Sequence, residues 1–223
     1  MDLQSFFRFP LEDLPFIVLA LILCFTVHEF AHAFMAYKFG DDTAYKEGRV
    51  TLNPVSHLDF LGFFLILIAG FGWAKPVPVR ASRFRKPRTM SIIVSAAGPI
   101  SNFLLGMIGT LVLVYLINSG FIHVGMDRST DAIYKFLGYF ISYNFLLFVF
   151  NLIPLPPLDG YRIVSEFLPL RVRYKVEQNI HWGTIIFLML VFIPHLREFT
   201  IDPILNLVNP LYRFALEFAQ SIL

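Results

Sequence analysis

Long apolar stretches constrain the fold of this chain more than any other feature of its sequence. A helix needs roughly 20 apolar residues to cross a bilayer. The longest apolar segments are Leu14–Phe39, Ser91–Ile117 and Ala132–Ile153, and a shorter one, Gly183–Phe199, is interrupted by Pro194. Within lipid every backbone N–H and C=O group must be paired inside the protein, which a helix achieves by itself. We therefore expect an all-α polytopic membrane protein.

Two further apolar stretches do not fit the same pattern. The run Leu58–Trp73 carries Asp59 near its start and is short for a span, so we expect it to be re-entrant rather than crossing the membrane. The C-terminal stretch Ile201–Leu223 holds Pro203 and Pro210, and it forms either a broken last span or an interfacial helix. The expected fold has four to six transmembrane helices, with a re-entrant or extended segment between the first two core helices.

The composition agrees with lipid contact and excludes some classes of protein. Hydrophobic residues make up 57% of the chain and charged residues only 15%, whereas soluble domains carry about a quarter charged residues. The net charge of +2 is too small to indicate a nucleic-acid partner, and we expect none. The only cysteine, Cys24, cannot form an internal disulfide or a cysteine-based zinc site.

Basic residues are concentrated in two of the segments that join the apolar stretches. Lys and Arg are frequent in Ala74–Met90, which has no Asp or Glu, and in Pro154–Trp182, whereas Asn118–Asp131 contains only Arg128. Lys and Arg accumulate in cytoplasmic loops. We therefore expect the first two segments to be cytoplasmic and the third to lie outside.

The first apolar stretch contains an H-E-x-x-H motif, His28-Glu29-Phe30-Ala31-His32. Residues four apart share a face of a helix, so both imidazoles can reach one metal ion. Two imidazoles and a carboxylate with an open position for water suit catalytic zinc, and Glu29 can act on such a water as general base. The alternative is a buried polar network that packs helices together, although ionisable groups inside a span are functional candidates by default.

Asp159 is the best candidate for a third ligand. It lies in Asn151–Gly160, after the apolar stretch that ends at Ile153, and three prolines in this segment prevent the helix from continuing. Irregular backbone near the membrane is tolerated where it lines a protein cavity, and an aspartate there could complete a metal site. The alternative is that Asp159 is the N-cap of a short helix, Gly160–Phe167.

At this point the sequence resembles the site-2 protease family of intramembrane zinc metalloproteases. Its H-E-x-x-H is matched, and Asn151, Pro154, Asp159 and Gly160 match the family's N-x-x-P-x-x-x-x-D-G. Further blocks similar to the family, two of them to its compact bacterial branch without extra domains, are Ala97–Asn102, Gly72–Val79 and Gly48–Pro54. Tyr161 is a small departure, because many relatives carry a second Gly there.

The resemblance implies an intramembrane zinc endopeptidase that cleaves membrane-spanning protein substrates near the cytoplasmic side. One zinc ion would be bound by His28, His32 and Asp159, and Glu29 would activate water. Asn151 is similar to a residue near the active site that holds the substrate backbone or the oxyanion.

We expect residues 1–223 to be a single integral-membrane domain with a catalytic core at about 14–168. Its partners would be the lipid bilayer and membrane-spanning substrates, in a bacterial-type plasma membrane, and the sequence defines no oligomeric state. Two other classes compete with this interpretation. A metal permease would use the buried histidines to line an ion path, and an inactive protease-like scaffold would bind membrane proteins without cutting them.

Small and polar residues indicate how the helices pack. Gly98, Asn102 and Gly106 recur every four residues, and such stripes allow close helix approach in lipid. We expect this stripe to contact the H-E-x-x-H helix, with Asn102 as an interhelical hydrogen-bond donor. Asn144 is a further candidate for a helix–helix hydrogen bond.

Pro76 and Pro78 favour an extended segment. It could pair with an unwound substrate by strand addition, or it could be a plain connecting loop. The remaining histidines have no partner at ligand spacing and are not expected to bind metal: His57, His123, His181 and His195.

Overall fold

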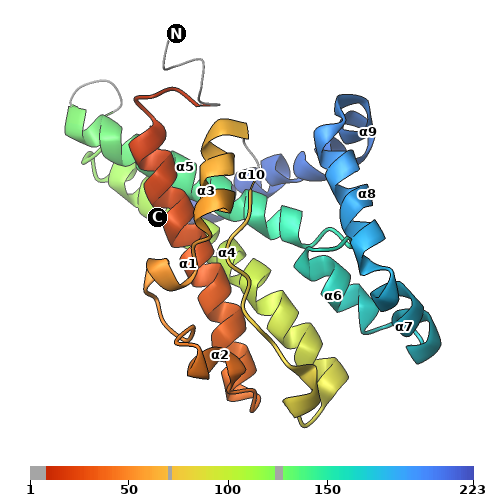
Figure 1. The fold of residues 1–223 in the computed structure, drawn as a ribbon. Coiled ribbons are helices and arrows are strands. Elements are labelled where there is room, and N and C mark those ends of the chain that lie inside the picture. The colour runs from red at the N-terminus through yellow and green to blue at the C-terminus, as the bar shows by residue number, and fades with distance from the viewer. Residues whose placement is uncertain (1–8, 70–71, 124–127) are drawn as a thin grey trace.

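The structure, a computed structural model, describes residues 9–69, 72–123 and 128–223. Every regular element in these residues is a helix, which confirms the all-α prediction (Figure 1). Those long and apolar enough to span a bilayer are α1 (Leu14–Lys38), α4 (Pro87–Asn118) and α5 (Arg128–Asn151). They match the three longest apolar stretches of the sequence to within a few residues at each end.

The helices after α5 include a sharply bent pair. α8 (Ile180–Phe192) is followed by α9 (Pro194–Leu205) and α10 (Val208–Ile222), and the chain turns by 95° between α8 and the helices after it. The break coincides with the expected interruption at Pro194, which has no backbone N–H to continue the helical hydrogen bonds of α8. The described residues thus offer three candidate spans, or four if the bent pair counts as one, so the predicted four to six is reached only when the bent pair is included.

The run predicted to be re-entrant forms a short helix and an extended tail. α3 (Phe60–Ala69) has 10 residues, too few to cross a bilayer. Residues 72–80 belong to no helix or strand, run as a stretched-out, extended trace (Figure 1), and lead through a 3-10 turn, Ala81–Arg83, into α4. This confirms a non-spanning segment between the first two core helices. The remaining short helices are α2 (Thr43–Lys46), the 3-10 turn Pro54–Ser56, α6 (Asp159–Ser165) and α7 (Leu170–Gln178).

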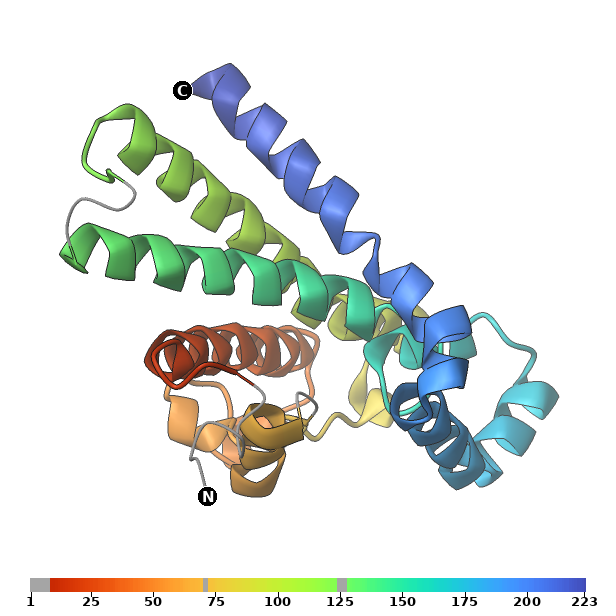
Figure 2. The same cartoon turned by 90° about the horizontal axis from the view of Figure 1, so that it is seen from above.

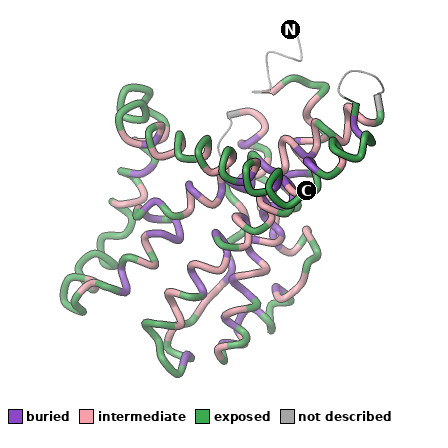
Figure 3. Tube along the Cα trace, turned by 180° about the vertical axis from the view of Figure 1, so that it is seen from behind, coloured by how far each residue is buried: buried purple, intermediate pink, exposed green. Residues whose placement is uncertain are grey.

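The spans α1, α4 and α5 pack against one another, and α10 lies on the side of α4 and α5 that faces away from α1 (Figure 2). Buried and exposed residues alternate along all three spans (Figure 3). The stripe of small and polar residues on α4, Gly98, Asn102 and Gly106, contacts two neighbouring helices, α1 and α5, rather than α1 alone. Gly98 faces the histidines of α1, as expected, but a Cβ on Gly106 would lie 2.7 Å from the ring of Phe145 on α5. The stripe therefore brings α4 close to both other spans.

A buried amide joins the three spans. Asn102, fully buried on α4, donates from Nδ2 to Asn144 Oδ1 on α5 (2.9 Å) and to the Cys24 carbonyl of α1 (3.3 Å). Both asparagines thus form the interhelical hydrogen bonds that the sequence predicted. In lipid such bonds stabilise helix contacts by about 1 kcal/mol each, and here they fix the helix that carries the H-E-x-x-H motif.

Candidate metal centre

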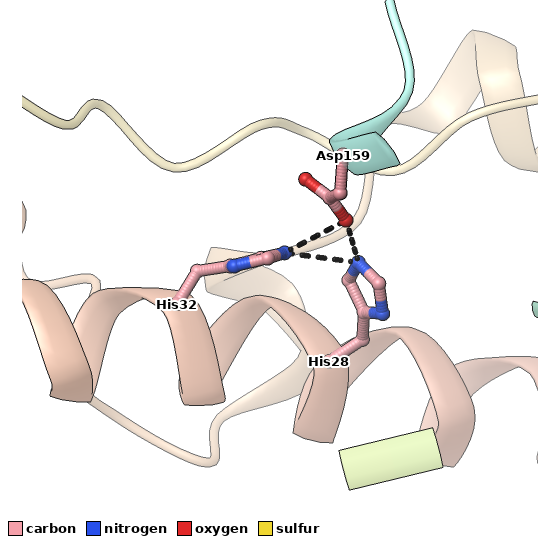
Figure 4. Close-up of side chains that lie close together, drawn as sticks. All are labelled: His28, His32 and Asp159. Carbon is pink, nitrogen blue, oxygen red and sulfur yellow. Dashed lines mark hydrogen bonds and ion pairs between the residues drawn. The ribbon is translucent and has the colours of Figure 1, made fainter. Parts of the chain in front are cut away.

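The two histidines of α1 and one carboxylate converge on a single point (Figure 4). The Nε2 atoms of His28 and His32 are 3.1 Å apart, and Asp159 Oδ2 lies 3.2 Å from each of them. All three residues are buried. Among the described residues this is the one group of His, Cys, Asp or Glu arranged to hold a metal ion. Asp159 joins it from 127 residues beyond His32.

These distances fit zinc. Tetrahedral zinc binds imidazole nitrogen and carboxylate oxygen at about 2.0–2.2 Å, which places the ligand atoms about 3.3 Å from one another. The three observed separations are 3.1–3.2 Å. Two imidazoles and one carboxylate are also a donor set of catalytic zinc, with the fourth position left for water.

The remaining ring nitrogens orient both histidines. Nδ1 of His28 lies 2.6 Å from Asn102 Oδ1, and Nδ1 of His32 lies 2.7 Å from the Val94 carbonyl. Both partners are acceptors, so each Nδ1 carries a proton, and with a metal ion bound each Nε2 would present its lone pair to the shared point. Such outer partners fix the tautomer and orientation of metal-binding histidines. Asn102 is therefore more than the packing residue that we expected, since it also aims His28.

Local backbone structure explains how Asp159 reaches this point. It is the first residue of α6, and Leu158 rather than Asp159 is the N-cap. The carboxylate is directed at the two imidazoles, so the predicted N-cap alternative does not describe it. Burial opposes the charged form of this carboxyl, but the adjacent His32 and His28 imidazoles hold the pKa of Asp159 below its usual value.

Glu29 lies beside the three ligand candidates without joining them. Its side chain is buried, and its Oε2 accepts a hydrogen bond of 3.1 Å from the backbone N–H of Val77. This bond holds the carboxylate against the extended segment 72–80. Glu29 is thus oriented and lines the same cavity as the histidines, as a general base requires.

The histidines, Glu29 and Asp159 open onto a cavity of about 300 Å³. Its walls are mostly apolar and come from α1, segment 72–80, α5, α6 and α8. Two further polar side chains line it, Asn151 and Arg162. Asn151 Nδ2 donates to the Leu147 carbonyl at 3.0 Å, one turn back on α5. Arg162 was not singled out in the sequence, where it counted only as one of the cytoplasmic cations.

The backbone of α4 closes against the metal site at Gly98. A Cβ there would lie 2.7 Å from His28 Nε2 and closer still to His32 Nε2. Such a methyl group would occupy the space where the two imidazoles meet the ion.

We expect Gly98→Ala to lower the affinity for zinc by about 10- to 100-fold, the loss seen when metal ligands are misoriented. Gly138→Ala is the matched control, because a Cβ on Gly138 of α5 meets nothing within 4 Å. That control should bind zinc normally, with stability unchanged or slightly raised. Zinc titration of both purified variants checks this, and normal zinc affinity in Gly98→Ala would show that the helix can shift away.

A buried arginine holds the extended segment 72–80 through a hydrogen bond to its backbone. Arg49, only 4% exposed, donates from its guanidinium to the Lys75 carbonyl, and the Lys75 N–H donates to the His57 carbonyl at 2.9 Å. Both polar groups of the Lys75 peptide are therefore occupied, two residues before the Val77 N–H that binds Glu29.

Replacing Arg49 with Met should leave the Lys75 carbonyl without its donor at about the same side-chain volume. We expect this to destabilise the fold by about 1–3 kcal/mol. Arg49→Lys keeps one donor and should retain more stability. Thermal unfolding of both variants tests the contact, and equal melting temperatures for Met, Lys and wild type would refute it.

The other histidines lie outside the cluster, as predicted. His57 is fully buried, its Nε2 lies 2.7 Å from the Thr51 carbonyl, and burial lowers its pKa. His123, His181 and His195 are exposed. None of the four belongs to the metal-binding group found in the described residues.

Comparison with known proteins gives one consistent answer. The model of "Peptidase family M50" matches residues 117–193, which include Asp159. "Putative zinc metalloprotease YwhC" of Bacillus subtilis is 47% identical over 204 residues, 92% of this chain and 92% of the relative. "Putative zinc metalloprotease Rip2" of Mycolicibacterium smegmatis is 28% identical over 187 residues, 82% of this chain and 68% of the relative.

The protein of the same name from Mycobacterium tuberculosis (strain H37Rv) is 26% identical over 185 residues, 81% of this chain and 68% of the relative. No solved structure matches. Near-complete coverage of a relative at 47% identity shows the family. The chain therefore belongs to peptidase family M50, the site-2 proteases, and is a multi-pass membrane zinc metalloprotease.

Proposed function

We propose that this protein is an intramembrane endopeptidase that cleaves membrane-spanning protein substrates near the cytoplasmic side. His28, His32 and Asp159 would hold one zinc ion, and Glu29 would act as general base. The observation that carries the proposal is the convergence of three buried ligand atoms within 4.8 Å of one another, two of them on α1, a helix that can span the bilayer, and the third on α6.

The position of the site along α1 supports cleavage near the cytoplasm. His28 lies 14 residues after Leu14 and 10 before Lys38, or roughly 21 Å and 15 Å along the helix axis. The site is therefore nearer the C-terminal end of α1. Asp159 follows α5 on the segment rich in Lys and Arg, which the charge distribution assigns to the cytoplasm. A bacterial-type plasma membrane fits this orientation.

Peptide hydrolysis adds one water across the C–N bond. Bound zinc supplies a Lewis acid for the carbonyl and a water whose pKa is about 7. Glu29 accepts a proton from the attacking water as the C–O bond forms, and returns it to the nitrogen as the C–N bond breaks. The Val77 N–H holds Glu29 Oε2, which leaves the other carboxylate oxygen for this transfer. Asn151, on the cavity wall, can donate its second amide hydrogen to the substrate backbone or the oxyanion.

The substrate has to unwind before it can be cut, because a helix in lipid keeps its backbone groups paired. Segment 72–80 lines the cavity in an extended conformation, which suits pairing with an unwound strand better than a plain connection would. Pro76 and Pro78 lack N–H groups, and both polar groups of Lys75 are occupied. The substrate strand would accordingly donate to carbonyls of this segment more than it accepts from it.

One domain, residues 1–223, would carry this activity, with its core at about 14–168. Phe187 of α8 also lines the cavity, so the bent pair contributes to the wall beyond that core.

Cleavage in liposomes tests the proposal. The purified protein and a single-pass test substrate would be co-reconstituted, and the products mapped by mass spectrometry. We expect one cut in the cytoplasmic half of the substrate span, lost with a chelator and restored by zinc. Zinc flux without cleavage would favour the metal permease. Neither flux nor cleavage by zinc-loaded protein, over a panel of substrates, would favour the inactive scaffold.

A further inference from the structure

Arg162 is a cation on the wall of the catalytic cavity that has no side-chain partner among the described residues. It lies on α6, is exposed and lines the cavity. Its guanidinium forms no ion pair or hydrogen bond with the described residues; only its backbone carbonyl is used, by Ser165 Oγ. Arg173 on α7 shows the contrast, because it is paired with both Glu166 and Glu177.

The other charges around the cavity are already engaged. Glu29 accepts from the Val77 N–H, and Asp159 lies against the two imidazoles. With one divalent zinc ion bound, the carboxylates of Glu29 and Asp159 would leave no net charge at the centre, since −2 and +2 cancel. Arg162 then adds one positive charge that nothing on the cavity wall neutralises. A cavity in this state favours a ligand with a carboxylate.

The position of Arg162 defines where such a carboxylate would sit. Residues three apart on a helix have Cβ atoms about 5–6 Å from each other, so Arg162 and Asp159 lie on the same side of α6. An extended peptide advances about 3.3 Å per residue. With the length of its own side chain, Arg162 can reach a side chain within about three residues of the peptide bond held at the metal.

Resting on the proposed function, we propose that Arg162 is a specificity residue that binds a carboxylate side chain of the substrate close to the cleaved bond. The planar guanidinium binds carboxylates through two parallel hydrogen bonds, which makes the contact selective as well as attractive. Acidic residues are costly in hydrocarbon and collect at the membrane boundary. A site in the cytoplasmic half of the span would meet such a residue there.

A charge-swap experiment tests this inference. The parent substrate carries Gln at the three positions on each side of the mapped cut, and each position is changed singly to Glu or Lys. The ratio of kcat/KM for Glu over Lys is measured with zinc-loaded full-length wild type, Arg162→Glu and Arg162→Gln. Arg171→Glu is the matched control, because Arg171 is exposed on α7 and does not line the cavity.

Wild type should prefer Glu at one or more positions by about threefold to tenfold, the range of a partly exposed charge pair. Arg162→Glu should reverse that preference to Lys, Arg162→Gln should abolish it, and Arg171→Glu should keep it. Each ratio is taken within one variant, so it is independent of the amount of folded protein.

An unchanged preference in Arg162→Glu, or an equal reversal in Arg171→Glu, would overturn the inference while cleavage itself upheld the proposed function. No cleavage of any substrate by zinc-loaded wild type would instead reject the proposed function, and this inference with it.

Discussion

Replacing Glu29 with Gln is expected to leave zinc bound while lowering kcat by about 10³-fold. Gln has the same shape as Glu, and its amide oxygen can still accept the Val77 N–H. It cannot take a proton from water, and general acid–base groups contribute about 10²- to 10⁴-fold to rate. Glu29 is not among the three metal-ligand candidates, so the metal content should not change.

Metal analysis and cleavage of a single-pass substrate, both on the same preparation, measure the two effects. Glu47→Gln is the matched control, because Glu47 is exposed and lies outside the cavity lining. It should match wild type in both assays. Retention of more than a tenth of the wild-type turnover in Glu29→Gln would remove Glu29 from the role of general base.

Replacing Asp159 with Ala is expected to abolish both zinc binding and cleavage. Loss of partners that only orient metal ligands typically lowers metal affinity by 10- to 100-fold, and a lost ligand should lower it by more than about 100-fold. His28 and His32 alone would leave the site two-coordinate. Asp159→Asn keeps the shape but loses the charge, and should fall between wild type and Ala.

Zinc titration against a competing chelator measures this series. Asp202→Ala serves as the control, since Asp202 pairs with Arg197 on α9 and is not part of the metal group. Wild-type zinc affinity in Asp159→Ala would show that another residue is the third ligand.

The sequence was sufficient for the local and periodic parts of the structure. The spans followed from their apolar length, and the pairing of His28 with His32 followed from helix geometry. Asp159 could be proposed as the third metal ligand because the prolines before it end α5 and place an acidic residue near the membrane. Asn144 and Asn102 could be predicted to join helices, since polar groups in lipid need partners.

What the sequence could not provide depends on contacts between distant segments. The contact of Asn102 with His28 spans 74 residues and requires the rotation of α4 relative to α1. Arg162 looked like an ordinary cytoplasmic cation, and only the turn of α6 places it on the cavity wall. Arg49 belongs to the family-like block Gly48–Pro54, for which the sequence indicated no role for this residue. Only the structure shows that segment 72–80 brings the Lys75 carbonyl within hydrogen-bond distance of its guanidinium.

The sequence predicted the position of the bend in the C-terminal part but not its angle. Pro194 marked the interruption, whereas the 95° turn depends on how α8 and α9 pack. Phe187 and Ile201 share an apolar cluster with Ile153 and Leu158, which holds this bent pair against the segment that carries Asp159. These contacts join residues on three separate segments: α8, α9 and the connection between α5 and α6.

X-ray absorption at the zinc edge of the zinc-loaded protein tests the metal centre most directly. We predict a first shell of nitrogen and oxygen at about 2.0–2.2 Å, outer scattering from two imidazole rings, and one ring fewer in His28→Ala. A shell that contains sulfur, or a His28→Ala spectrum identical to that of wild type, would contradict binding by His28, His32 and Asp159.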